Sequence, residues 1–251
     1  MASATYPSLK DRTVVVTGGA SGIGEAIVRG FVGQGARVGF LDIDAGAAQK
    51  LVFELPADRV HFENRDLRDV DAIRAGITAI REKFGPITIL VNNAARDDRH
   101  DMDSVTSEYW DERLAANLKH QFFAAQAVAP DMRAAGYGAI VNMGSVSWMI
   151  GQGGMPAYTT AKSAVQGLTR SLARDLGPHN IRVNAVVPGW IMTQRQIDLW
   201  LNEETYKELL TRQCLKRKLY PDDIAKVVLF FTSDEAGACT NQSYVVDGGW
   251  V

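Results

Sequence analysis

Short apolar runs alternate with longer amphipathic stretches along most of this 251-residue chain, and this alternation constrains the fold more than any other feature. Each run is rich in valine, isoleucine and leucine and has the length of a strand buried on both faces. Strand and helix in alternation predict a mainly parallel sheet with helices on both faces. The runs are residues 13–16, 38–41, 60–62, 87–91, 139–142, 182–187 and 244–246, and the helical stretches include 24–34, 70–84, 109–135, 158–176 and 221–232.

We expect residues 1–251 to form a single domain, because no internal repeat, low-complexity tract or Pro/Ser-rich linker marks a boundary. The stretch 190–214 differs in texture from the rest. It follows Pro188-Gly189, is rich in polar and aromatic residues, and interrupts the strand and helix rhythm. We expect a substrate flap here; the alternative is a surface helical insertion.

The composition excludes several classes of protein. Hydrophobic residues make up 46% of the chain, charged residues 22%, and the net charge is -2, which does not suit a nucleic-acid binder. Two cysteines without CxxC spacing, and histidines without metal spacing, predict no metal site. The start of the chain lacks signal-peptide character and no apolar run could span a membrane, so we expect a soluble cytoplasmic protein.

A glycine-rich turn follows the first predicted strand. Gly18, Gly22 and Gly24 fall where strand gives way to helix, and glycine there lets the backbone approach a pyrophosphate at the helix N-terminus. Ser21 and Ile23 belong to the same turn. Turns also collect glycines for steric reasons, but the strand, turn and helix context predicts dinucleotide binding.

Asp42 ends the second predicted strand, where a dinucleotide fold places a carboxylate on the adenosine ribose hydroxyls. Its charge would repel a 2'-phosphate, and neither Ile43 nor Ser21 supplies a cationic partner for one. We therefore expect NAD, with NADP less favoured; the alternative is that Asp42 only caps the next helix.

Polar and small residues follow the third and fourth predicted strands. Asp66, followed by Leu67, is placed to hold the adenine amino edge, or else it caps a helix. Asn92 and Ala94 follow the fourth strand, and we expect them to line the binding crevice beside the adenosine.

Tyr158 and Lys162 stand four residues apart in a predicted helix, so their side chains share one helix face. A phenol and an ammonium group can therefore share a single site, in which the phenolate would be a base. Tyrosine, with an ordinary pKa of about 10, is a poor base at neutral pH. An ammonium about 5 Å away at an effective dielectric of about 20 favours the phenolate by roughly 3 kcal/mol, so we expect Lys162 to lower the Tyr158 pKa by about two units.

These motifs, together with further residues, resemble the short-chain dehydrogenase/reductase family nearly end to end. The resemblance implies a seven-stranded Rossmann-type sheet in three αβα layers, a catalytic tetrad, cofactor contacts at the Pro188 turn and Ile191, and a homotetramer. Asn117 would hold a water that links Lys162 to solvent. The matching residues are 17–24, 92–95, Asn117, Ser145, Tyr158, Lys162 and Pro188-Gly189.

Each tetrad residue has a role in such chemistry and a structural alternative. The Ser145 hydroxyl can donate to the alkoxide-like oxygen that develops during hydride loss. Otherwise Tyr158 is a packed aromatic, Ser145 a turn residue, Asn117 a core amide and Lys162 a solvated charge. The family resemblance favours the catalytic roles.

Candidate substrate residues lie around the predicted mouth of the site. Aromatic faces combined with hydrogen-bonding groups suit a carbohydrate, whereas the alternatives are a solvated charged loop and tryptophans packed in the core or between subunits. The candidates are Asp97, His100, Ser145, Ser147, Trp148, Gln152, Tyr158, Trp190, Gln194 and Arg195.

Several longer strings are more selective and resemble the bacterial aldose 1-dehydrogenases, including those that act on D-xylose. This resemblance implies NAD-linked oxidation of the C1 hydroxyl of a free pentose or hexose to a lactone. A polyol dehydrogenase or ketone reductase of the same family, and a non-catalytic NAD-binding regulator, are the alternatives. The choice among D-xylose, L-arabinose and D-galactose stays open, because epimers differ only in hydroxyl direction. The strings are 93–100, 109–113, 126–130, 145–148 and 213–216, and Ala95 departs from the usual glycine.

Overall fold

A computed structural model describes residues 4–251 and contains one seven-stranded sheet in which every neighbouring pair is parallel. The strand order is β3-β2-β1-β4-β5-β6-β7, which confirms the predicted Rossmann-type fold. The strands are β1 (Thr13–Thr17), β2 (Arg37–Asp42), β3 (Val60–Asn64), β4 (Ile89–Asn92), β5 (Gly138–Met143), β6 (Ile181–Pro188) and β7 (Ser243–Val246).

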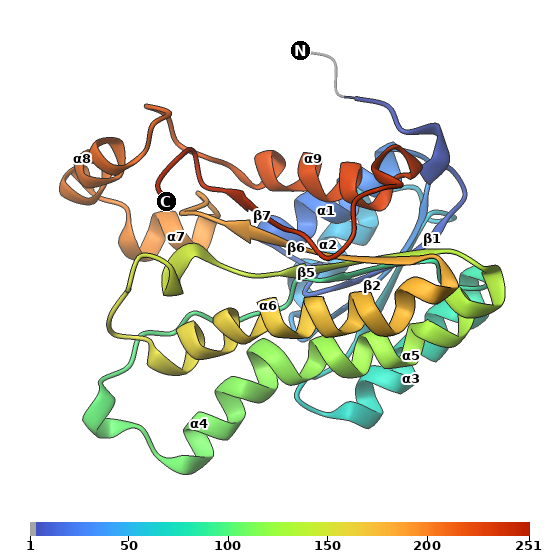
Figure 1. Ribbon diagram of the computed structural model, residues 1–251, viewed down its shortest axis with the longest axis horizontal. Helices are drawn as coiled ribbons and strands as arrows, with labels where there is room; N and C mark the ends of the chain where they lie inside the picture. The colour runs from blue at the N-terminus through green and yellow to red at the C-terminus, as the bar shows by residue number, and fades with distance from the viewer. Residues whose placement is uncertain (1–3) are drawn as a thin grey trace.

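Helices cover both faces of the sheet and complete three layers (Figure 1). One layer contains α1 (Gly22–Gly33), α2 (Ala45–Glu54) and α9 (Pro221–Thr232). The other contains α3 (Val70–Phe84), α4 (Ser107–Leu114), α5 (His120–Ala135) and α6 (Pro156–Leu176). Side chains of Asp44, Asp69 and Thr106 begin α2, α3 and α4 by accepting hydrogen bonds from first-turn backbone N–H groups. Short 3₁₀ turns lie at Pro7–Leu9, Met102–Ser104, Val146–Trp148, Gly177–His179 and Asp234–Ala236.

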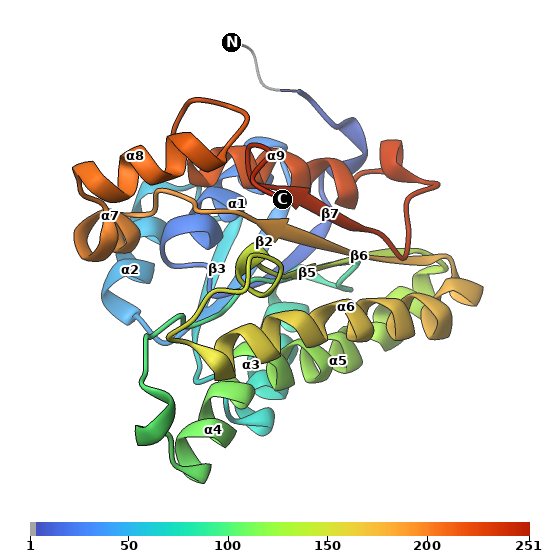
Figure 2. The same ribbon diagram turned by 60° about the vertical axis from the view of Figure 1, so that its left-hand side comes forward.

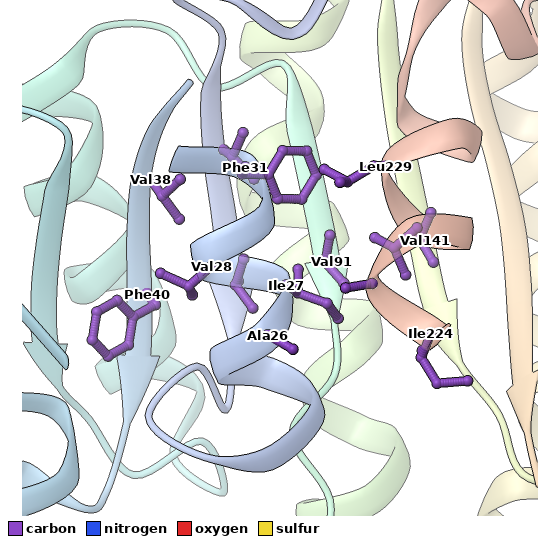
Figure 3. Close-up of a cluster of buried hydrophobic side chains, with 14 of the residues drawn as sticks. Ala26, Ile27, Val28, Phe31, Val38, Phe40, Val91, Val141, Ile224 and Leu229 are labelled. Carbon is purple, nitrogen blue, oxygen red and sulfur yellow. The ribbon is translucent and has the colours of Figure 1, made fainter. Parts of the chain in front are cut away.

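Alternation along the strands divides the core into two clusters. Val14 and Val16 of β1 pack with α1, α2 and α9, whereas Val15 packs with α3, α5 and α6. Figure 3 shows the first cluster, with Phe31 of α1 directed toward Leu229 of α9. Burial of both faces explains why these strands read as continuous apolar runs.

The structure differs from the expected elements at two places. The predicted helix over 109–135 is interrupted by a π-helical turn, Ala115–Lys119, and α2 lies in a stretch that we did not single out. The stretch 190–214 contains two helices, α7 (Gln194–Trp200) and α8 (Glu203–Arg212), and its role as a substrate flap stays a prediction.

The order of the strands predicts where the site lies. From β1 the chain adds β2 and β3 on one side of β1, and it then crosses to the other side to add β4 to β7. Open sheets of this kind bind ligands between the two central strands, here β1 and β4, at their carboxyl ends. In both views α7 and α8 lie beyond one end of the sheet, on the side where the chain enters α4 (Figure 1, Figure 2). Within residues 4–251, no helix has the length and apolarity needed to cross a membrane, and no three acidic, histidine or cysteine side chains gather as metal ligands.

Candidate active site

The glycine turn forms a cradle at the start of α1. Gly18 has φ of +67°, and a Cβ built on it would lie 2.7 Å from the Ala94 Cα. A Cβ on Gly24 would lie 1.8 Å from the Gly18 carbonyl oxygen. Any side chain at either position would therefore displace the backbone. The free N–H groups of the first turn of α1 give this cradle the character of an anion site.

Asp42 braces the cradle from β2 and also lines the cavity. One carboxylate oxygen accepts from the Ala20 N–H at 2.9 Å and the other from the Asp44 N–H at 3.0 Å. The Asp42 carboxylate has no ion-pair partner within residues 4–251. It can therefore accept hydrogen bonds from a ribose diol.

The consecutive asparagines at the end of β4 have different positions. Asn92 is fully buried and donates to the Asn142 Oδ1 at 2.9 Å and the Gln121 carbonyl at 3.0 Å. It does not line the cavity, because its side chain is bound to α5 and to the neighbouring strand β5. The Asn93 amide holds the glycine turn by donating to the Gly18 carbonyl at 2.7 Å, and Asn93 lines the cavity together with Ala94 and Ala95.

Asp66 does not contribute its carboxylate to the cavity wall. The Arg68 guanidinium binds both carboxylate oxygens, with contacts of 2.6 to 3.0 Å, and this bonding holds the Asp66 pKa below its ordinary value. Leu67 and Arg68 line the cavity instead. The predicted contact between Asp66 and an adenine stays a prediction.

Tyr158 and Lys162 lie on the first turns of α6, as their spacing predicts. Lys162 is 1% exposed, its Nζ donates to the Met143 carbonyl at 2.9 Å, and it lies 5.7 Å from the centroid of the Tyr158 ring. Both side chains line the cavity. Met143 ends β5, so the sheet itself fixes the position of the ammonium.

Burial controls the protonation of this pair. It raises the pKa of Tyr158 to about 12; the Ser145 hydroxyl opposes the rise, Asp97 adds to it and Arg99 opposes it. Burial also lowers the pKa of Lys162 to about 8, with Asp97 opposing. The structure contradicts the expected depression of the Tyr158 pKa, because desolvation of the phenolate is the largest influence on it.

Ser145 lines the cavity with Tyr158 and Lys162, whereas Asn117, the fourth residue of the predicted tetrad, does not. Ser145 follows β5, and its Oγ accepts from the Ser147 N–H at 3.2 Å. Asn117 is fully buried in the π-helical turn, where its amide donates to the Arg113 carbonyl at 2.9 Å and accepts from the Arg96 N–H at 2.8 Å. The wider turn thus gives this amide partners on both sides, as π-turns often do at functional sites.

One cavity of about 770 Å³ connects the glycine turn to the tyrosine and lysine pair. This volume lies in the range of small-molecule and cofactor sites. Twenty of the residues predicted from the sequence line it: Gly18, Ser21, Gly22, Ile23, Gly24, Asp42, Leu67, Ala94, Asp97, Ser145, Ser147, Gln152, Tyr158, Lys162, Pro188, Gly189, Trp190, Ile191, Gln194 and Arg195.

The connection between β4 and α4 is tied to α7 across the mouth of this cavity. Asp97 accepts from the Gln196 amide at 2.7 Å and pairs with Arg195 at 3.4 Å. The Gln196 carbonyl accepts from the Trp190 indole at 2.9 Å, and Asp98 pairs with Arg195 at 2.7 Å. These contacts hold residues 190–196 at the mouth of the cavity.

Two predicted substrate residues lie outside the cavity wall. His100 accepts from the Ala157 N–H at 3.4 Å and contacts the Tyr109 hydroxyl at 3.1 Å, so it links the β4 to α4 connection to the start of α6. Trp148 is 36% exposed and belongs to a shallow groove along α6. Neither position offers the side chain to a ligand held at Tyr158.

Comparisons with known proteins agree with this geometry. A family model described as enoyl-(acyl carrier protein) reductase matches residues 18–251. A solved Sinorhizobium meliloti protein, assigned as a short-chain alcohol dehydrogenase, superposes with a TM-score of 0.90 at 32% identity, over 97% of this chain and 98% of that one. The chain belongs to the short-chain dehydrogenase/reductase family.

Two relatives of this dehydrogenase match along its whole length. A "Probable galactose dehydrogenase" of Rhizobium meliloti is 50% identical over 250 residues, 98% of each chain. D-xylose 1-dehydrogenase of Caulobacter vibrioides is 46% identical over 252 residues, 100% of each chain. The chain is accordingly an oxidoreductase of CH–OH groups that uses a nicotinamide cofactor.

The cavity of this dehydrogenase fits such a cofactor. The glycine turn at the N-terminus of α1 would hold the pyrophosphate and Asp42 would accept hydrogen bonds from the adenosine ribose, while Tyr158 and Lys162 line the same cavity. When bound, the nicotinamide accepts the hydride.

Sequence reasoning missed several residues of the wall. Asn93 and Arg99 lie inside the string 93–100 that was singled out, but the sequence did not show which residues of that string face the cavity. Trp200 lies inside the stretch 190–214 that was singled out as a whole, and the fold brings Trp250 to the cavity from the end of the chain.

Proposed function

We propose that this dehydrogenase oxidises the C1 hydroxyl of a free aldose to the lactone, with NAD as the hydride acceptor. The proposal rests on one observation: Ser145, Tyr158 and Lys162 line the same cavity as the glycine turn and Asp42. The two full-length relatives that act on galactose and xylose support a sugar as substrate.

Tyr158 accepts the C1 hydroxyl proton in this proposal. Its pKa of about 12 in the pocket makes the phenol a strong base once it is ionised, and Lys162 below the ring stabilises the phenolate. Ser145 donates to the oxygen on which negative charge develops. The Asn117 amide accepts from the Arg96 N–H and donates to the Arg113 carbonyl, so it holds the backbone at Arg96 in the cavity wall.

The substrate end of the cavity suits a polyhydroxylated ring. Asp97, Gln152, Gln194 and Arg195 offer hydrogen-bond acceptors and donors, and Trp190 offers an aromatic face. The Ser147 hydroxyl is buried and has no partner among residues 4–251, so a substrate hydroxyl can satisfy it.

NAD is proposed over NADP because of the unpaired Asp42 carboxylate. Free cysteines at 214 and 239 suit the reducing cytoplasm, where we propose that the enzyme works. We also propose a homotetramer, since Phe122 of α5 and Trp148 before α6 expose apolar surface.

A spectrophotometric screen tests the function. The purified chain is mixed with NAD or NADP and with D-xylose, L-arabinose, D-galactose, matching polyols and secondary alcohols, and cofactor reduction is followed. We expect NAD reduction with at least one aldose and little with the polyols. Turnover of polyols alone would replace the proposal with a polyol dehydrogenase, and binding of NAD without any turnover would indicate a regulator.

A further inference from the structure

Charged side chains in the cavity wall are mostly paired, and the exceptions lie at opposite ends. At the cofactor end the exception is the Asp42 carboxylate. At the substrate end it is Arg99, which forms no ion pair within the described part of the chain, alongside the catalytic Lys162. The paired groups are Arg65 with Glu63, Arg68 with Asp66 and Glu112, Arg96 with Asp98, Asp97 with Arg195, and Arg212 with Glu208.

Arg99 is held by neutral neighbours. Its guanidinium carbon lies 5.0 Å from the centroid of the Trp200 ring. In the orientation that satisfies the Gln152 amide, the Gln152 oxygen accepts from both terminal nitrogens of Arg99, at 2.9 and 3.0 Å. These contacts orient the guanidinium and leave its charge uncompensated.

Arg99 lines the same cavity as Tyr158, the reacting group. Asp97, an acidic side chain of the same cavity, is already bound by Arg195 and Gln196. Among residues 4–251, Arg99 is therefore a cation of the cavity wall without a carboxylate partner.

We propose that Arg99 is an anion subsite and that this dehydrogenase also oxidises hexuronic acids, sugars whose C6 carboxylate lies across the ring oxygen from C1. A guanidinium binds a carboxylate through two parallel hydrogen bonds, an arrangement that a neutral hydroxymethyl group cannot replace. The proposal rests on the C1 oxidation proposed above.

The chemical step is unchanged for a uronate. The C1–H bond breaks and its electron pair leaves as hydride to the nicotinamide cofactor, while the C1 hydroxyl proton passes to Tyr158. The C6 carboxylate keeps its oxidation state, and the product is the lactone of the corresponding dicarboxylic acid. No additional oxidant is required.

The test compares matched pairs of sugars, D-galactose with D-galacturonate and D-glucose with D-glucuronate, in the wild type, in Arg99→Met and in the exposed control Arg133→Met. For wild type we expect turnover of at least one uronate. Arg99→Met should lower its kcat/KM roughly 10- to 100-fold, the usual range for loss of a charged hydrogen-bonding partner, and change the value for the neutral partner less than about 3-fold. Arg133→Met should leave both values unchanged.

Salt dependence in the wild type gives a second readout that needs no variant. The kcat/KM for the uronate should fall as ionic strength rises, while the value for the neutral sugar stays level. Equal losses on both sugars in Arg99→Met would make Arg99 a structural link to Trp200 and overturn the proposal. Turnover of neutral aldoses without any uronate would also overturn it and leave the C1 oxidation standing, whereas inactivity with every sugar would remove both.

Discussion

At the scale of single residues, two aspartates of the cavity wall, Asp42 and Asp97, have separate roles. Asp42 lies at the adenosine end and its oxygens accept two backbone N–H groups, whereas Asp97 lies at the mouth and binds α7. Their charges act on different ligands, so each can be neutralised and tested by itself.

Neutralising Asp42 should relax the choice of cofactor. Asp42→Asn keeps an acceptor for the Ala20 N–H but removes the charge that repels a 2'-phosphate. We expect the ratio of kcat/KM for NAD to that for NADP to fall roughly 10-fold or more, since one charge interaction near a surface is worth several kcal/mol at short range. Asp44→Asn, at the α2 N-cap outside the cavity, is the matched control. An unchanged ratio would remove Asp42 from cofactor selection.

The raised pKa of Tyr158 fixes the sign of the pH dependence. A base must be unprotonated, and a pKa near 12 means that the phenolate fraction increases throughout the neutral and alkaline range. With cofactor saturating, kcat/KM for the sugar should therefore rise with pH from about 6 to 8, the range in which Lys162, whose pKa is about 8, keeps its charge.

Asp97→Asn should move this rising limb to lower pH, because Asp97 raises the Tyr158 pKa. Asp103→Asn, in the 3₁₀ turn before α4, should not move it. Tyr158→Phe should abolish the rise with pH and lower kcat roughly 100-fold or more. A flat profile in the wild type would exclude Tyr158 as the base.

At the scale of elements, the α7 segment depends on a few side-chain links to the β4 to α4 connection. Gln196 joins the Trp190 indole to the Asp97 carboxylate. Gln196→Ala removes both hydrogen bonds, each worth about 1 kcal/mol, so amide hydrogen exchange over 194–212 should quicken roughly 10- to 30-fold. Gln194→Ala is the control, since that amide donates to Asp198 within the same helix. Equal exchange in both variants would mean that this segment is not held by Asp97.

The elements themselves were largely predictable, and the exceptions have physical causes. Buried parallel strands can be recognised in the sequence as apolar runs. The π-turn at 115–119 cannot, because it adds one residue to a helix whose apolar pattern continues across it. The consecutive asparagines 92 and 93 look alike in sequence, and only the sheet register turns one into the core and the other to the cavity. The pKa of Tyr158 depends on burial, which spacing does not report.

At the scale of the whole molecule, the fold and the cofactor end of the site follow from local signals, whereas the substrate end does not. The glycine turn and Asp42 act through backbone conformation and charge close to their own strands. The mouth is assembled from the β4 to α4 connection, α7 and Trp250, which are far apart in the chain. Sugar specificity depends on how these parts sit together, so it cannot be read from spacing.

Oxidation at C1 by the tyrosine-centred site is the central claim, and deuterium at C1 tests it most directly. The sugar most active in the screen is prepared with deuterium at C1 or, as the control, at C2, and turnover is measured with NAD. We predict a primary isotope effect on kcat/KM and deuterium in the reduced cofactor for the C1-labelled sugar alone. Deuterium transferred from C2, or unlabelled reduced cofactor from the C1-labelled sugar, would contradict the account.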